Sequence, residues 1–360
     1  MACELLFPHE HARWYTGGVT TTLSDSITNG YRSEASLGQK RVLLLKPRGF
    51  CAGVVRAIDV VKIALDTFGA PIYVRREIVH NRYVVHELAE KGAIFVHEID
   101  DVPDGQRVIY SAHGVSPAVR EISKRRHLKV IDATCPLVTK VHIEAVKFAK
   151  QGYSLVLIGH RDHDEIEGTL GEAPEATRVV SNVAEARALE VPDPNRVAYL
   201  TQTTLSLDEA RDIIHALKEK FPNIVGPQSQ DICYATENRQ VAVRNVAHNA
   251  GLVLVVGSTN SSNSNRLVEV SRNLGTIGYL IDNSQAINPA WLEGVSTVAV
   301  TAGASAPEVL VEDVVNYLQL NGFNNVEEVE VMPENVRFGL PPEIVQAIGG
   351  AGGAETVPVR

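Results

Sequence analysis

Short apolar runs alternate along the chain with longer stretches in which apolar residues recur every three or four positions. Most of the runs are continuously apolar, which is typical of parallel strands buried on both faces. They predict strands at residues 42–45, 71–74, 94–96, 108–111, 129–131, 155–158, 197–200, 252–256, 277–280 and 297–300. The longer stretches predict helices at residues 54–68, 81–91, 117–126, 138–151, 206–221, 237–250, 265–274 and 307–320. This alternation predicts an α/β fold with mainly parallel sheets.

Three cysteines stand where a helical pattern begins. Cys51 and Cys135 each follow an apolar run, Pro136 occupies the first turn after Cys135, and Cys233 precedes a third helix. Unpaired N–H groups and the positive end of the helix dipole favour a thiolate there, and a thiolate is what iron or zinc binds. One such cysteine is ordinarily a buried structural residue. Three in the same local setting raise the hypothesis of one shared metal site.

The cysteines also divide the chain. We expect three similar α/β units, at residues 41–133, 134–230 and 231–306, arranged around a central cavity. Residues 307–342 are expected to pack back onto an earlier unit, and residues 343–360 to form a flexible tail. Residues 1–40 lack a sustained period and are treated as an extension of unknown role. Ligands of parallel sheets bind at the carboxyl ends of strands, so the residues after each run are the candidates for a site.

Neutral hydrogen-bonding side chains gather at these strand ends. They are His80, His113, His160, His163, Thr201, Gln202, Thr203, Thr204, Ser258, Thr259, Asn260, Ser261, Ser262, Asn263, Thr301 and Ser305. Such groups, with helix N-termini, can surround phosphate oxygens without fixed cations. Helix capping explains any one Ser or Asn, but the recurrence at several strand ends predicts an anion pocket.

His80, His113 and His163 have a second interpretation, a zinc site of a hydrolase that acts on a phosphorylated small molecule. That alternative lacks an HExxH or CxxC spacing and leaves the three cysteines without a use.

Glu165, two residues after His163, is a candidate proton donor. A carboxyl group held away from water and near an anion has a raised pKa and can carry a proton at neutral pH. The spacing does not separate Glu165 from Glu167, and an ordinary acid at a helix start explains either residue.

Composition narrows the class of protein. The 360 residues carry a formal net charge of −9 and no long basic run, so nucleic acid is not an expected partner. No apolar stretch approaches the roughly 20 residues that span a bilayer, so no membrane contact is expected. Four cysteines do not make a disulfide framework, which fits a reducing, cytoplasmic setting.

Several longer motifs together resemble one known family. They are GFCAGV (49–54), SAHG (111–114), ATCP (133–136), GH followed by HDEIEGT (159–169), TQTTLS (201–206), DICYATENRQ (231–240) and GSTNSSNS (257–264). In this order they resemble the 4-hydroxy-3-methylbut-2-enyl diphosphate reductases, from about residue 41 to about residue 338. These enzymes catalyse the last step of the non-mevalonate isoprenoid pathway.

The resemblance implies a mechanism and a cofactor. Cys51, Cys135 and Cys233 would hold a 4Fe–4S cluster by three irons, leaving the fourth iron open for the substrate's hydroxyl oxygen; the usual ligation uses four cysteines. Two electrons and protons would remove that hydroxyl as water and give isopentenyl or dimethylallyl diphosphate. The family further implies a ferredoxin or flavodoxin as electron donor. A non-catalytic iron–sulfur sensor that binds a diphosphate remains a third hypothesis.

The resemblance also assigns residues. Glu165, rather than Glu167, would deliver protons, with help from Thr203. Asp164 is a departure, because the family more often has a proline between the histidine and the glutamate. The side chains that would bind the diphosphate are His80, His113, His163, Ser261, Ser262, Asn263 and Ser305.

Overall fold

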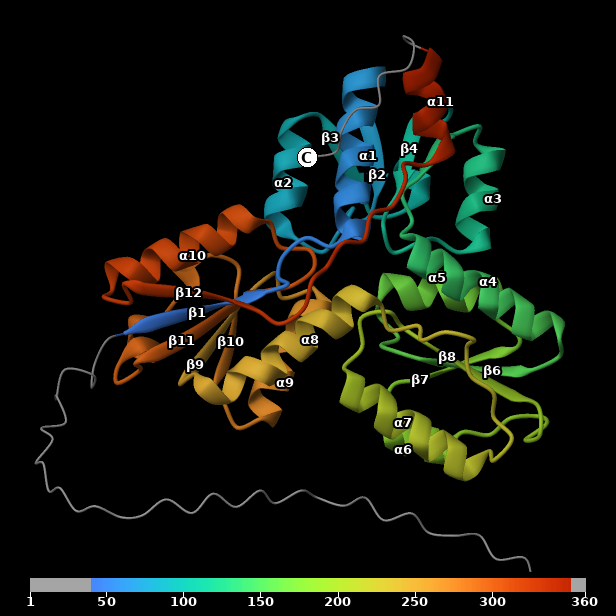
Figure 1. Cartoon of the computed structure of the whole chain (residues 1–360). Coiled ribbons are helices and arrows are strands. Elements are labelled where there is room, and N and C mark those ends of the chain that lie inside the picture. Colours follow the sequence, from blue (N-terminus) through green and yellow to red (C-terminus); the bar gives the residue numbers. More distant parts are fainter. Residues whose placement is uncertain (1–39, 351–360) are drawn as a thin grey trace, which may run out of the picture. The chain divides into compact units, whose positions relative to one another are not determined.

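The computed structural model describes residues 40–350, which contain three parallel β-sheets (Figure 1). Sheet A has the order β10-β9-β11-β1-β12, sheet B the order β3-β2-β4-β5, and sheet C the order β7-β6-β8. The strands of sheet A are β1 (Arg41–Lys46), β9 (Leu252–Val256), β10 (Gly278–Ile281), β11 (Thr297–Ala302) and β12 (Asn325–Glu330). Sheet B contains β2 (Ile72–Arg75), β3 (Ala93–Val96), β4 (Arg107–Tyr110) and β5 (Lys129–Asp132). Sheet C contains β6 (Ser154–Ile158), β7 (Thr177–Val180) and β8 (Val197–Thr201).

Eleven α-helices connect and cover these strands within the described residues. They are α1 (Ala52–Phe68), α2 (Arg82–Glu90), α3 (Pro117–Arg125), α4 (Pro136–Lys150), α5 (Asp164–Glu172), α6 (Val183–Ala188), α7 (Leu207–Lys220), α8 (Tyr234–Val246), α9 (Ser262–Asn273), α10 (Glu308–Leu320) and α11 (Pro342–Gly350). The α/β class with parallel sheets is therefore confirmed. None of the helices in residues 40–350 is both long enough and apolar enough to cross a membrane.

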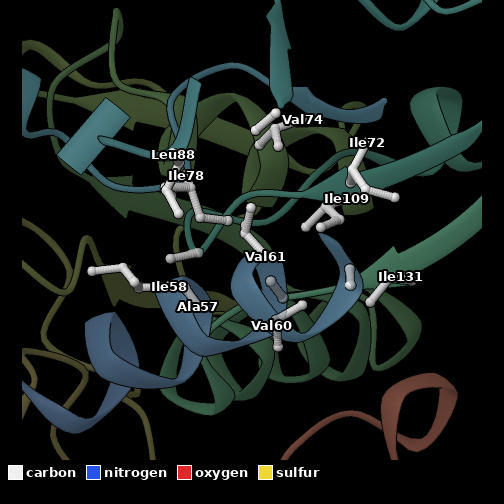
Figure 2. Packing of buried hydrophobic residues seen from close by; sticks show 14 of the residues in the cluster. Ala57, Ile58, Val60, Val61, Ile72, Val74, Ile78, Leu88, Ile109 and Ile131 are labelled. Atoms are coloured by element: carbon white, nitrogen blue, oxygen red, sulfur yellow. The ribbon is translucent and has the colours of Figure 1, made fainter. Parts of the chain in front are cut away.

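Three of the helices each pass from one sheet to the next. Helix α1 follows β1 of sheet A but packs on sheet B, where Ala57, Val60 and Val61 are fully buried. Figure 2 shows these side chains together with the apolar residues Ile72, Val74, Ile109 and Ile131 from the strands of sheet B. Helix α4 likewise packs on sheet C, and α8 on sheet A. Each sheet is thus completed by a helix that begins beside another sheet.

The sequence placed β1 wrongly. Residues 41–46 were expected in the first unit, with the strands that became sheet B, but β1 pairs with β11 and β12 in sheet A. The reason is that parallel strands buried on both faces have similar apolar runs, so hydrophobicity does not identify a strand's neighbours. Strand β12 pairs with β1 and so brings the segment after α10 back onto sheet A.

The C-terminal region also differs from its prediction. Residues 343–350 were expected in a flexible tail, but they belong to α11, whose Ile344 is completely buried against the core of α1 and sheet B. The remaining tail residues, and the extension at residues 1–39, lie outside the described part of the chain. Helices α5 and α6 and strands β7 and β12 were not predicted because they are too short to show a clear apolar period.

Candidate functional site

Strand ends and helix N-termini from all three sheets surround one cavity. It holds about 670 Å³ of empty space, a volume that includes its opening to solvent. All of the residues that the resemblance assigns to a site line it: Cys51, His80, His113, Cys135, His163, Glu165, Thr203, Cys233, Ser261, Ser262, Asn263 and Ser305. Residues separated by as many as 254 positions in the sequence are therefore brought together, as 51 to 305.

The three cysteines form the thiol end of this cavity. Cys51, Cys135 and Cys233 are the N-cap residues of α1, α4 and α8. Their backbone N–H groups donate to carbonyls just beyond one strand of each sheet, at distances of 3.0–3.2 Å: Ala304 after β11, Ala112 after β4 and Thr203 after β8. The same local geometry thus recurs three times around the cavity.

A glycine leaves space between two of the sulfurs. A Cβ atom on Gly53 would lie 2.8 Å from Sγ of Cys135 and 3.8 Å from Sγ of Cys51. Real Cβ atoms do not approach a sulfur so closely without displacement of a neighbour. Gly53 therefore keeps open the space that two of the thiols share.

Backbone N–H groups at the helix N-termini lower the thiol pKa as expected, but at two of the three cysteines burial outweighs them. Burial, followed by the charge of Cys51, raises the pKa of Cys135 to about 12. The same two causes raise the pKa of Cys233 to about 11, although Thr236 donates to its sulfur and opposes the shift. Desolvation and mutual repulsion of thiolates exceed the helix effect. A bound cation would reverse this balance, so the donor set suits a metal centre that carries positive charge.

Histidine side chains form part of the opposite, anion end, which comprises His80, His113, His163, Ser261, Ser262, Asn263 and Ser305. The rings of His80 and His113 stack with centroids 4.0 Å apart, and His163 meets them edge-on at 5.3 and 5.8 Å. Burial and the neighbouring histidines hold the pKa of His113 well below its ordinary value. The same causes lower the pKa of His163 to about 4. His113 and His163 are therefore neutral at pH 7 and offer hydrogen bonds rather than fixed charge.

Hydroxyl and amide groups complete the anion end. Ser261 caps α9 by accepting a hydrogen bond from the backbone of Ser264. Ser305 donates to the carbonyl oxygen of His80 at 2.9 Å, and Asn263 accepts from the backbone of Ala304 at 2.8 Å. The Ser305 bond joins the ends of sheets A and B, and the Asn263 bond lies at the end of sheet A. Capping and the anion pocket are thus two uses of the same group of residues.

Glu165 lies between the two ends and is 2 % exposed. Its carboxylate accepts two hydrogen bonds from Thr203, from the backbone N–H at 2.7 Å and from the hydroxyl at 2.8 Å. Burial raises the pKa of Glu165 to about 7, although both of these hydrogen bonds oppose the shift. Glu167 does not line the cavity and instead pairs with Arg75 and Arg76. The structure therefore separates the two glutamates that spacing left equivalent.

The geometry does not support zinc on the three histidines. In residues 40–350 the one cluster whose ligand atoms all lie within 4.8 Å of one another contains His80, His113 and Asp164, not His163. Nδ1 of His163 accepts a hydrogen bond from the backbone of Glu165, and Asp164 is paired with Arg76. A guanidinium group already neutralises the carboxylate that a divalent cation would need.

Sequence reasoning missed the lining residue Thr236 and named Thr204 only among the polar residues that follow the strand at residues 197–200. Thr236 donates to Sγ of Cys233 from its backbone and places its hydroxyl 3.2 Å from that sulfur. Thr204 bonds to Ser262 at 3.1 Å. Thr236 was recognisable, because residue N3 of a helix commonly bonds to the N-cap side chain and Cys233 was predicted at a helix start.

The sequence and the fold match one family. The family model described as LytB protein matches residues 42–319. A 4-hydroxy-3-methylbut-2-enyl diphosphate reductase from Leifsonia xyli is 54 % identical over 314 residues, which cover 87 % of this chain and 93 % of that protein. A reductase of the same name from an Azoarcus species is 54 % identical over 311 residues, covering 86 % of this chain and all of that protein.

Solved structures show the same relationship. The structure of the E-1-hydroxy-2-methyl-but-2-enyl-4-diphosphate reductase from Plasmodium falciparum is 42 % identical, with a TM-score of 0.85, and the match covers 87 % of this chain and 99 % of that one. The structure of an (E)-4-hydroxy-3-methyl-but-2-enyl diphosphate reductase, described as the terminal enzyme of the non-mevalonate pathway, is 30 % identical with a TM-score of 0.55. It covers 78 % of this chain and 99 % of its own. The chain therefore belongs to the LytB family of 4-hydroxy-3-methylbut-2-enyl diphosphate reductases and is an oxidoreductase.

Proposed function

We propose that this enzyme reduces (E)-4-hydroxy-3-methylbut-2-enyl diphosphate to isopentenyl diphosphate and dimethylallyl diphosphate, with a 4Fe–4S cluster bound to Cys51, Cys135 and Cys233. One observation carries the proposal: a single cavity is lined by three thiols, an anion pocket and a carboxyl group whose pKa is about 7. The identity of the substrate is taken from the family. The cavity has a region suited to each chemical group of that substrate.

The bound cluster would supply two electrons and an open iron that acts as a Lewis acid. The chain's own residues supply the remainder. The anion end binds the diphosphate through imidazoles, hydroxyls, an amide and the N-terminus of α9. No Lys or Arg side chain is among the lining residues in the described part of the chain. The diphosphate is therefore held by oriented dipoles, and its position sets the distance between the allylic hydroxyl and the thiol end.

Glu165 is the proton source. Protons must reach the hydroxyl as it leaves as water, and a carboxylic acid with a pKa near the working pH suits this task. The two hydrogen bonds from Thr203 fix the orientation of the carboxyl group. Loss of water needs one proton and formation of the new C–H bond needs another, so two protons accompany the two electrons.

The electrons come from another protein in this proposal. A ferredoxin or flavodoxin, each a small carrier of low potential, is the kind of donor that the family implies. We place the reaction in the cytoplasm, where a reducing environment maintains free thiols and an iron–sulfur centre. Neither nucleic acid nor a membrane has a part in this proposal.

Anaerobic purification tests the cofactor and turnover tests the reaction. A brown protein with iron and sulfide near one 4Fe–4S cluster per chain, converting the substrate when a low-potential donor is reduced, is the expected result. A colourless protein that remains without iron after reconstitution would contradict the cofactor assignment. A brown protein that binds the diphosphate without turning it over would indicate the sensor.

A further inference from the structure

A set of three cations recurs at equivalent positions behind the thiol end. The helix that begins at each cysteine carries a basic residue five or six positions later: Arg56 after Cys51, Lys140 after Cys135 and Arg239 after Cys233. None of the three lines the cavity. We call them the ring cations, because each bonds to the loop that carries the next cysteine in a closed cycle.

Arg56 makes the first link, from the Cys51 helix to the Cys135 loop. Its guanidinium donates to the carbonyl oxygen of Thr134 at 3.0 Å, directly before Cys135, and to that of Gly339 at 2.7 Å. Arg56 is 9 % exposed, so these bonds form away from bulk water.

Lys140 makes the second link, from the Cys135 helix to the Cys233 loop. Its ammonium donates to the carbonyl oxygens of Ser229 and Gln230 at 2.6 and 3.1 Å and to Asp231 at 2.9 Å. The other carboxylate oxygen of Asp231 accepts from the backbone of Thr201 at 3.0 Å. The loop before Cys233 is thereby tied both to α4 and to the end of β8.

Arg239 closes the cycle, from the Cys233 helix to the Cys51 loop. It is completely buried and donates twice to the carbonyl oxygen of Gly49, at 2.7 and 3.2 Å, two residues before Cys51. Glu334 accepts from the same guanidinium at 3.0 Å and balances its charge. The hydroxyl of Tyr234 adds a neutral link by accepting from the backbone of Ala52 at 3.1 Å.

The fold explains why one cation per unit is sufficient. Each unit begins at one cysteine, with the helix that packs on its sheet, and ends at the next cysteine, in the loop beyond its strands. A bond from the first helix to the final loop therefore fixes the spacing of the two cysteines that bound the unit. Three such bonds fix all three spacings among the thiols.

We propose that Arg56, Lys140 and Arg239 are positioning residues that hold the three thiols at the separations a cluster requires. We also propose that the charge of Arg56, whose side chain donates to backbone carbonyls and to no carboxylate within residues 40–350, raises the reduction potential of the cluster. This inference rests on the proposed cofactor. Groups that orient metal ligands without touching the metal commonly change metal affinity by about 10- to 100-fold when they are removed. Positive charge near an iron–sulfur cluster favours its reduced form.

Lys140→Met is the first variant to test, because 26 % of this side chain is exposed, whereas Arg56 and Arg239 are buried. After anaerobic reconstitution we expect the cluster of this variant to be lost to a chelator about tenfold faster than that of the wild type. Lys140→Arg keeps the charge and should recover most of the lifetime. Lys62→Met, on α1 but paired at the surface with Glu87, is the matched control and should match the wild type.

The reduction potential of the cluster distinguishes an effect of charge from general damage to the fold. Arg56→Met should give a more negative potential than Lys62→Met, whereas Arg56→Lys should stay near the wild type. Melting curves and circular dichroism identify which variants fold. A folded Lys140→Met protein with the wild-type cluster lifetime overturns the positioning role. An unchanged potential in folded Arg56→Met overturns the role of its charge.

A second probe keeps this test distinct from that of the proposed function. A wild-type protein that takes up no cluster would refute the cofactor, and Co²⁺ would then report on the thiols, because thiolate coordination gives intense near-ultraviolet bands. Weaker bands in folded Lys140→Met than in Lys62→Met would support the ring cations. Equal bands would overturn them.

Discussion

The two ends of the cavity use charge in opposite ways. The anion end is the proposed diphosphate site, yet its lining within residues 40–350 contains no Lys or Arg. The thiol end would bind a metal cluster, and three cations lie behind it, on the helices that begin at the cysteines. Charge is thus absent where the anion binds and present where the ligands of a metal are positioned.

The difference follows from a separate requirement at each end: the protonation of Glu165 near the anion end, and the position of the cysteine loops at the thiol end. In the proposed reaction, neutral donors bind the phosphate oxygens without changing the protonation of Glu165. A nearby Lys or Arg would lower the pKa of Glu165 and deprive the site of its acid. At the thiol end the cations bond to backbone carbonyls, so they position the loops without occupying the cavity.

The largest expected effect comes from the residue between the two ends. Glu165→Gln keeps the size of the side chain and removes the proton, so turnover should fall by about 10²- to 10⁴-fold, as for loss of a general acid. Steady-state rates with a reduced low-potential donor measure the loss, and the visible spectrum should remain that of the wild type. Glu167→Gln is the control and should retain turnover, because Glu167 pairs with arginines outside the cavity. Full activity of Glu165→Gln would contradict the role of this residue.

A substitution that adds one methyl group, Gly53→Ala, tests the thiol end. Gly53→Ala would place a Cβ atom 2.8 Å from Sγ of Cys135, so the sulfur must move and the cluster should be bound weakly or not at all. Iron content per chain after reconstitution measures this. Gly349→Ala, with no atom within 4 Å of the added Cβ, is the control. Normal iron content in Gly53→Ala would show that the thiols do not share that space.

A smaller effect is expected at the anion end. His113→Ala removes one hydrogen-bonding group from the diphosphate, and a bond to a charged group contributes about 1.5–3 kcal/mol. KM should therefore rise by about 10- to 100-fold, while iron content stays unchanged. His86→Ala, an exposed position on α2, should leave KM as it is. A change in kcat alone would place His113 in the chemical step instead.

The sequence predicted the residues of the two cavity ends better than it predicted the strand pairing and contacts that hold those residues in place. Each cysteine stood at a recognisable strand-to-helix junction, and the polar residues followed apolar runs, so local patterns located both. The partners of β1 could not be predicted in this way, since every buried parallel strand has the same apolar character. The thiol pKa shifts also depend on distances between remote residues, which no local pattern contains.

The ring cations illustrate the same limit. Basic residues five or six positions after a cysteine are visible in the sequence, but a charge in a helix is ordinarily a solvated one. Only the packing of α1, α4 and α8 on successive sheets shows that Arg56 and Arg239 are buried against carbonyls. Local motifs thus indicate the functional residues, but they do not indicate the contacts that hold those residues in position.

The finest test concerns the acid between the two ends. In the proposed mechanism Glu165 donates protons in its neutral form. Its pKa is about 7, so turnover should be constant at lower pH and fall as the pH rises above about 7. The hydroxyl of Thr203 bonds to the carboxylate and lowers this pKa. Thr203→Val removes that bond, so the pKa should rise and the fall in kcat should move to higher pH, by up to about one unit for a bond of about 1 kcal/mol. Thr203→Ser retains the hydroxyl and should keep the wild-type pH profile. A profile of Thr203→Val that moves to lower pH would mean that the titrating group is not Glu165, and the site would then need another acid.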